Sequence, residues 1–112
     1  MYVQKHNYNY GVDAIRFEWD ERKNEANLRK HGVRFEEAAL AFEDPLRISR
    51  LDRVVDGEER WQTFGRVGPV VLLMVAHTVH EEVDGSLVET IRIISARQAT
   101  NYERREYEDE DC

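Results

Sequence analysis

The sequence predicts an α+β fold: an antiparallel meander sheet of about four or five strands, two consecutive N-terminal helices and one C-terminal helix. The first observation behind this prediction is that two helical segments come early, between residues 20 and 44. The second is that the strand-like segments after them follow one another directly, so consecutive strands are expected to pair, with the helices on one face. The third is length, because 112 residues suit a single domain of roughly 100–200 residues.

The folded part of this single domain is expected to span residues 15–107. Residues 1–14 are polar and rich in Tyr and Asn, which is typical of a flexible lead-in. Residues 108–112 form an acidic tail. The domain is therefore expected to lie between a polar lead-in and an acidic tail.

A short strand and a surface helix are expected to open the domain. Residues 15–19 predict the strand. Asp20 is expected to cap a helix that runs to about His31, because its carboxylate can accept a hydrogen bond from an early backbone N–H, and Gly32 supplies the end. This helix is polar on nearly every side, so we expect it to lie on the surface.

A second helix is expected to follow at once. Apolar residues recur at i, i+3, i+4 and i+7, which gives one apolar stripe: Phe35, Ala38, Ala39 and Phe42. The Asp44-Pro45 pair is expected to end this helix, because the residue before a proline is disfavoured in the helical region.

Strands and a last helix are expected to make up the rest of the chain. The predicted strands are residues 46–51, 60–66, 70–79 and 87–95, with turns at 52–58, 68–69 and 84–85. The third of these strands is a continuous apolar run, which is typical of a central strand. The last helix has two possible starts, since Ser95 with Gln98 and Thr100 with Glu103 both fit a capping box.

The net charge of −7 argues at first against a nucleic-acid partner. Mapped along the chain, however, the charge separates into segments. Residues 22–34 and 91–105 are basic, whereas residues 81–89 and 106–112 are acidic. The average therefore hides two basic segments, and it does not exclude binding to nucleic acid.

Several classes of protein are disfavoured by the sequence. The only cysteine is Cys112, which excludes a disulfide framework and a cysteine zinc site. No apolar run approaches the roughly 18 residues of a membrane span, and the N-terminus lacks the apolar core of a signal peptide, so we expect a cytoplasmic protein without a membrane partner. His77 and His80 are three residues apart on an expected strand and face opposite sides, so neither a metal site nor a cofactor is expected.

The remaining polar residues suit the cleavage of RNA without a metal. In that reaction the 2′-OH attacks the adjacent phosphorus, a base takes its proton, an acid protonates the 5′-oxygen, and cations hold the charge on the phosphate. His and Glu suit proton transfer, and the guanidinium fork of Arg suits a phosphate. Arg97 at a strand–helix junction is a credible phosphate site, and Trp19 or Trp61, if exposed, could stack a base.

Two motifs in these segments are specific in combination. They are WD-x-x-K-x-x-x-N-x-x-KHG, from Trp19 to Gly32, and IRIISAR, from Ile91 to Arg97. With them the chain resembles the BrnT toxins, the ribonuclease component of BrnT–BrnA type II toxin–antitoxin pairs (a family formerly called DUF497), over about residues 15–107. Further matching positions are Phe17, Glu18, Val33, Phe35, Ala38, Asp44-Pro45, residues 58–60, residues 98–100, Glu103, Arg104 and Tyr107.

The resemblance implies a RelE-like fold, metal-independent RNA cleavage and arrest of translation. It also implies neutralisation by a BrnA-like antitoxin with a ribbon-helix-helix domain. The two proteins are expected to form a complex, with 2:2 as the candidate stoichiometry, that represses its own operon, so DNA is contacted only through the antitoxin.

Site residues are carried over from the family by position. The implied catalytic residues are His31, Glu59, Arg60, Arg92 and Arg97, and the RNA-binding residues are Lys23 and Lys30, with Trp19 added for base stacking. Proton transfer is assigned to His31 or Glu59, phosphate binding to the arginines, and steering of the RNA backbone to the lysines.

Two positions depart from the family pattern. Arg34 stands where Ser or Thr usually caps the second helix, and Gln98 stands where a basic residue is common. The acidic charge and Gln98 favour an alternative, a catalytically inactive toxin-like module that binds an antitoxin and acts in operon repression. A metal-dependent hydrolase is a third class, which the histidine spacing disfavours.

Overall fold

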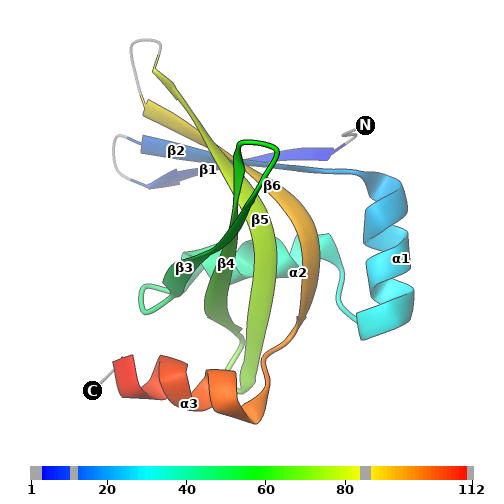
Figure 1. The fold of residues 1–112 in the computed structure, drawn as a ribbon, viewed down its shortest axis with the longest axis vertical. Helices are drawn as coiled ribbons and strands as arrows, with labels where there is room; N and C mark the ends of the chain where they lie inside the picture. Colours follow the sequence, from blue (N-terminus) through cyan, green and yellow to red (C-terminus); the bar gives the residue numbers. More distant parts are fainter. Residues whose placement is uncertain (1–3, 11–12, 84–86, 111–112) are drawn as a thin grey trace.

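The computed structural model describes residues 4–10, 13–83 and 87–110. Figure 1 shows a curved sheet with α2 behind it and α3 below it. The six strands lie in the order β1-β2-β6-β5-β4-β3, with the bounds β1 Gln4–Tyr10, β2 Asp13–Trp19, β3 Ile48–Val55, β4 Glu58–Val67, β5 Val71–Val83 and β6 Leu87–Gln98. The helices are α1 Glu21–His31, α2 Phe35–Leu40 and α3 Asn101–Glu110, with a short 3₁₀ helix, η1, at Ala41–Glu43. None of the helices in these residues is long and apolar enough to cross a membrane.

The α+β class is confirmed, but the sheet differs from the expected antiparallel meander of four or five strands. From β3 to β6 each strand does pair antiparallel with the next. On its other side, however, β6 pairs parallel to β2. The expectation of a purely antiparallel sheet is therefore wrong. Two helices, η1 and three strands separate β2 from β6, and this long crossover lets β6 return beside β2 in the same direction.

Both ends of the described chain contain regular structure outside the expected limits of the domain. Residues 4–10, which the sequence places in the lead-in, form β1 and pair antiparallel with β2. Residues 108–110, which it places in the acidic tail, end α3. These polar segments lack an apolar period, so the sequence pattern does not predict the backbone hydrogen bonds that they form.

The two ends of α1 are as predicted. The backbone N–H of Arg22 donates to Oδ1 of Asp20 at 2.8 Å, so Asp20 caps the helix. Gly32 ends it in the left-handed conformation, with φ of 72°, where a side chain would be strained.

α1 is less of a surface helix than its polar sequence predicts. Asn24 and Asn27 are buried. The side-chain N–H groups of Asn27 donate to the carbonyl oxygens of Val33 at 2.9 Å and Ala96 at 2.8 Å, and its Oδ1 accepts from the backbone N–H of Ala96 at 3.1 Å. Hydrogen bonds to the edge of β6, rather than an apolar stripe, therefore fasten α1 to the sheet.

The main core lies on the face of the sheet that α2 and η1 cover, which we call the α2 face. The predicted apolar stripe packs there and is buried. α2 ends at Leu40, and η1 continues the turn as far as the predicted stop at Asp44-Pro45. The strand residues of this core are Ile15, Phe17, Trp19, Leu73, Val75, Ile91, Ile93 and Ala96.

α3 packs on the opposite face, the α3 face, so the expectation that all helices share one face is wrong. A second buried cluster lies there, formed by Phe64, Leu72, Met74 and Tyr107. The Tyr107 hydroxyl also donates to Asp44 at 2.6 Å. Side chains alternate along β5, so Leu72 and Met74 reach α3 while their neighbours face α2, and both faces of the strand are apolar.

The start of α3 distinguishes the two predicted capping boxes. The backbone N–H of Glu103 donates to Oγ1 of Thr100 at 3.1 Å, and the backbone N–H of Thr100 donates to Oε1 of Glu103 at 2.9 Å. This reciprocal pair is the capping box of α3. The alternative start is wrong, because Ser95 lies within β6.

The predicted turns have different outcomes. The turn expected over residues 52–58 is shorter, because β3 extends to Val55 and β4 begins at Glu58. Asp56 and Gly57 alone join the strands, with positive φ of 50° and 80°, as a tight type I′ hairpin requires. The turn expected at residues 84–85 lies outside the described residues.

Candidate functional site

A bulge in β6 brings two of the predicted arginines to the same face. In the pairing of β5 with β6, Ala76 lies opposite Ser95 and His77 lies opposite Ile93, so Ile94 is an extra residue. An extra residue reverses the alternation of side chains along a strand. Arg92 and Arg97, five positions apart, therefore both lie on the α3 face.

Arg60 and Arg92 meet on one carboxylate. Nη2 of Arg92 donates to Oε1 of Glu58 at 2.6 Å, and Nε of Arg60 lies 3.3 Å from the same oxygen. The two guanidinium groups are half-buried, with 29% of the Arg60 side chain and 25% of the Arg92 side chain exposed. Glu58 therefore orients Arg92 by a hydrogen bond and attracts Arg60 by charge alone, since Nε of Arg60 forms no hydrogen bond in the described residues. The cluster keeps a local positive charge.

Arg97 is held by α3. Its Nη1 and Nη2 donate to the two carboxylate oxygens of Glu103 at 2.8 and 3.0 Å. This bidentate contact lowers the pKa of Glu103 to about 2 against the opposing effect of burial, and it raises the pKa of Arg97. Glu103 thus caps α3 and holds Arg97 at the same time, so Arg97 is oriented before any ligand arrives.

Arg50 of β3 also lies on this face. Its Nε donates to Gln62 at 3.0 Å, and its Nη1 lies 3.3 Å from Glu106 of α3. We call Arg50, Arg60, Arg92 and Arg97 the arginine face. Four guanidinium groups along one side of a sheet suit the binding of successive phosphates, because each offers a rigid fork of N–H donors.

Sequence reasoning missed Arg50, and it missed that His80 lies on the same side of the sheet as the arginine face. His80 is exposed on β5 and borders a hollow of about 610 Å³ together with Glu58 and Thr78. The prediction that His77 and His80 face opposite sides is confirmed, because His77 is buried on the α2 face. The same alternation could have placed His80 beside the arginines, had the neighbours of β5 been known.

Glu59 does not belong to the arginine face. Along β4, side chains alternate, so Glu58 and Arg60 point to the α3 face and Glu59 points to the other. Glu59 instead lines a cavity on the α2 face, beside Trp61. The expected catalytic residues Glu59 and Arg60 therefore lie on opposite faces of the sheet, as alternation along a strand that begins at residue 58 predicts.

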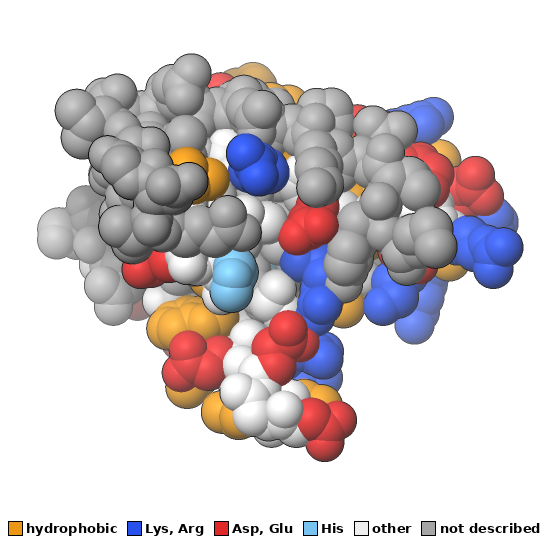
Figure 2. All heavy atoms as spheres, turned by 90° about the horizontal axis from the view of Figure 1, so that it is seen from above, with side chains coloured by type: hydrophobic (Ala, Val, Ile, Leu, Met, Phe, Trp, Pro, Cys, Tyr) orange, Lys and Arg blue, Asp and Glu red, His pale blue; other side chains and the backbone are white. Residues whose placement is uncertain are grey.

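The basic residues of α1 lie on a helix that is bonded to the edge of β6. Lys23 and Lys30 are exposed, and His31 is the half-buried last residue of the helix. α1 is bonded to β6 at Ala96, next to Arg97. Figure 2 shows Lys and Arg side chains gathered on the right, where α1 lies in Figure 1. A cation at the end of a helix is favoured by the helix dipole, so the last turn of α1 suits its basic residues.

Trp19 cannot stack a base in this structure. Its side chain is completely buried and packs edge-on against Phe35, with ring centroids 6.1 Å apart. The expectation that it binds RNA is therefore wrong, because an apolar ring at this position serves the core. The half-buried Trp61 lies on the α2 face, away from the arginines.

The described residues contain no group of three or more His, Cys, Asp or Glu side chains placed to hold a metal ion. The charged groups that do converge are guanidinium and carboxylate groups. The fold and the site thus define a small α+β protein with an arginine-lined sheet face that suits a phosphodiester substrate.

Comparison with known proteins identifies the family to which the chain belongs. The family model described as "Ribonuclease toxin, BrnT, of type II toxin-antitoxin system" matches residues 19–103. The chain therefore belongs to the BrnT family of ribonuclease toxins. Among solved structures, the Brucella abortus ribonuclease toxin BrnT is similar, with 28% sequence identity, a TM-score of 0.49, and coverage of 74% of this chain and 94% of that one. No curated protein matches the chain.

Proposed function

We propose that this protein is an endoribonuclease that cleaves RNA without a metal ion and thereby arrests translation in the cytoplasm. The observation that carries the proposal is the pair of guanidinium groups, Arg60 and Arg92, that share the carboxylate of Glu58 on one sheet face, with Arg97 on the same face. Membership of a family of ribonuclease toxins supports the same reaction.

In the proposed reaction, Arg60 and Arg92 hold the non-bridging oxygens of the scissile phosphate, and Arg97 holds a neighbouring one. The 2′-oxygen attacks phosphorus and the bond to the 5′-oxygen breaks, which leaves a 2′,3′-cyclic phosphate and a 5′-hydroxyl. We assign removal of the 2′-OH proton to His80, because it shares this face, in place of His31 or Glu59. Water protonates the leaving oxygen. The arginines supply the stabilisation of negative charge that the reaction needs.

The test is cleavage of a single-stranded RNA oligonucleotide by the purified protein in the presence of a chelator. We expect fragments that end in a cyclic phosphate, and no cleavage of the 2′-deoxy oligonucleotide. Arg92→Ala is expected to lower the rate by about 10²–10³, whereas Arg105→Ala, at an exposed position of α3, retains it. Wild-type protein that leaves RNA intact, or that cleaves it only when metal is added, contradicts the proposal.

The biological arm of the proposal concerns an antitoxin. We propose that a BrnA-like antitoxin binds this toxin in a 2:2 complex, and that only the antitoxin contacts operator DNA. Expression of the toxin alone is expected to stop growth, and co-expression of the antitoxin to restore it. Light scattering of the purified complex measures the stoichiometry.

One observation favours a second candidate function, an inactive toxin-like module that binds an antitoxin and acts in repression. Arg97 and Glu103 form a bidentate pair that also caps α3, so this arginine serves the fold. Under that reading the protein binds antitoxin and supports repression, but neither wild type nor the Arg92→Ala variant cleaves RNA.

A further inference from the structure

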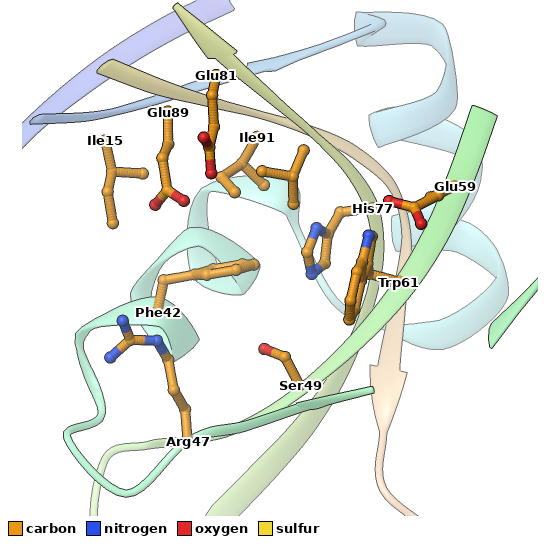
Figure 3. A pocket seen from close by; sticks show the side chains of 11 residues that line it. Ile15, Phe42, Arg47, Ser49, Glu59, Trp61, His77, Glu81, Glu89 and Ile91 are labelled. Atoms are coloured by element: carbon orange, nitrogen blue, oxygen red, sulfur yellow. The ribbon is translucent and has the colours of Figure 1, made fainter. Parts of the chain in front are cut away.

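A cavity of about 480 Å³ opens on the α2 face, on the side of the sheet opposite the arginine face. Figure 3 shows the rings of Phe42 and Trp61 on either side of it, with Glu81 and Glu89 at one end and Ser49 at the other. Its size lies within the range of ligand sites, roughly 300–1,000 Å³. None of these residues contributes to the proposed ribonuclease chemistry, so a ligand in this cavity is independent of RNA cleavage.

A chain of hydrogen bonds decides the direction in which the Ser49 hydroxyl, which lines this cavity, donates its proton. His77 Nδ1 lies 3.2 Å from the carbonyl oxygen of Thr78, so this nitrogen carries the proton. Nε2 must then accept from Thr63, at 2.6 Å. The Thr63 oxygen in turn accepts from Ser49, at 2.7 Å. Ser49 therefore directs its proton into the protein and offers only lone pairs to the cavity.

The imidazole at the end of this chain adds no positive charge. Burial lowers the pKa of His77 to about 4, and its ring packs edge-on against Phe42 with centroids 5.0 Å apart. Arg47, the cation that lines the cavity, lies on the side away from the glutamates in Figure 3 and donates to the Asp44 carbonyl oxygen at 3.1 Å.

Two glutamates lie side by side on adjacent strands at one end of the cavity. Glu81 of β5 and Glu89 of β6 are directly opposite in the strand register, and both line the cavity. Within the described residues neither carboxylate forms an ion pair. Like charges at directly opposite positions destabilise a sheet, and a cation placed between them reverses that effect.

We propose that this cavity binds the arginine side chain of a protein partner. A guanidinium group is flat, so it stacks on Trp61, and its N–H donors match the carboxylates and the Ser49 lone pairs. The volume leaves room for an apolar neighbour of the arginine against Phe42. A phosphate or an RNA strand is repelled by the same glutamates. A protein is the source of the arginine because a type II toxin works with an antitoxin protein.

In the test, the 112-residue protein is titrated with Nα-acetyl-L-arginine amide, and its amide and indole N–H signals are followed by NMR. The uncharged isostere, Nα-acetyl-L-citrulline amide, is the matched probe. We expect the indole signal of Trp61 and the amides of Ser49 and Glu81 to shift at millimolar arginine amide, and not with citrulline amide. Equal shifts with both probes, or no shift at Trp61, overturn the proposal.

Variants locate the site. The double variant Glu81→Gln/Glu89→Gln is expected to weaken binding at least tenfold, and its thermal unfolding to show an intact fold, because a like-charge pair is removed. Glu25→Gln, on the exposed side of α1, leaves binding unchanged. Unaltered binding in the double variant overturns the proposal. If free L-arginine binds more tightly than the capped amide, the ligand is a small molecule. That result overturns the proposal that the arginine belongs to a protein partner.

Discussion

Neighbouring residues on a strand of this sheet have unrelated roles, as Glu58 and Glu59 show. Both fit the family pattern, and both are carboxylates at the start of β4. Glu58 accepts from Arg92 at 2.6 Å on the α3 face, whereas Glu59 lines the cavity on the other face. Alternation of side chains, not residue type, therefore decides which carboxylate belongs to the proposed active site.

A pair of variants tests this assignment. Glu58→Gln keeps the shape of the side chain but removes the charge that holds two guanidinium groups, so we expect kcat for RNA cleavage to fall by about tenfold or more. Glu59→Gln is expected to leave kcat within about twofold. Initial rates with one oligonucleotide substrate measure both, and the reverse order of effects returns the catalytic role to Glu59.

His77 makes the stability of the fold depend on pH. Its pKa is about 4 in the folded protein, because burial disfavours the charged ring, against 6.5 for an ordinary histidine. The unfolded chain therefore binds the extra proton first as the pH falls. The contribution of neutral His77 to the free energy of unfolding is fully present above pH 6.5, and it is lost progressively as the pH falls from 6.5 to 4.

Urea unfolding at two pH values measures this effect. Between pH 7.5 and pH 5 we expect the free energy of unfolding to fall by about 2 kcal/mol through His77. In a His77→Gln variant this part of the pH dependence disappears, whatever the absolute stability of the variant. If the His77→Gln variant loses as much free energy of unfolding between the two pH values as wild type does, other groups cause the pH dependence.

At the scale of elements, specific contacts rather than apolar stripes hold several helices. α1 is bonded to the edge of β6 through Asn27, and α3 is docked through Tyr107 and Asp44. η1 approaches β4 at Gly65, where a Cβ atom would collide with the carbonyl oxygen of Ala41. The backbone of η1 can lie this close only because residue 65 lacks a side chain.

Two glycine variants separate crowding from backbone strain. Gly65→Ala places a methyl group against backbone that has little room to move, so a loss of roughly 1–3 kcal/mol is expected. Gly32→Ala meets nothing within 4 Å and strains only φ, which costs about 1 kcal/mol. Chemical denaturation of both variants shows which one loses more free energy of unfolding. A Gly65→Ala variant as stable as wild type shows that η1 can shift away from β4.

At the scale of the whole molecule, the net charge of −7 is a poor guide to the partners of each face. The arginine face carries four guanidinium groups, and the acidic residues of α3 lie beside it. Glu106 is 3.3 Å from Arg50. RNA binding must therefore compete with these local carboxylates, and the competition is electrostatic and depends on salt.

Two single-charge variants distinguish local competition from net charge. Glu106→Gln releases Arg50 and is expected to raise affinity for single-stranded RNA about two- to fivefold at low salt. Asp109→Asn changes the net charge equally at an exposed position and is expected to have a smaller effect. Fluorescence anisotropy measures both, and equal gains show that only net charge matters. Removal of all the acidic residues by truncation after Arg105 does not test this competition, because it also removes the buried Tyr107.

Much of the local structure could be predicted, because it depends on short-range chemistry. The Asp20 cap, the Gly32 end, the apolar stripe of α2 and the Asp44-Pro45 stop are all confirmed. The parallel pairing of β2 with β6, the role of β1 and the position of α3 could not be predicted in this way. They depend on which polar edges and apolar faces meet after the chain has folded back.

The sequence by itself determined the α+β class, most element positions and the family, because these follow from periodicity, capping residues and motifs. Only the tertiary structure decided which charged residues share a site. The bulge at Ile94 moves Arg97 to the face of Arg92. Side chains alternate across a sheet, so a single extra residue changes the face, and its effect shows only when the strand register is known.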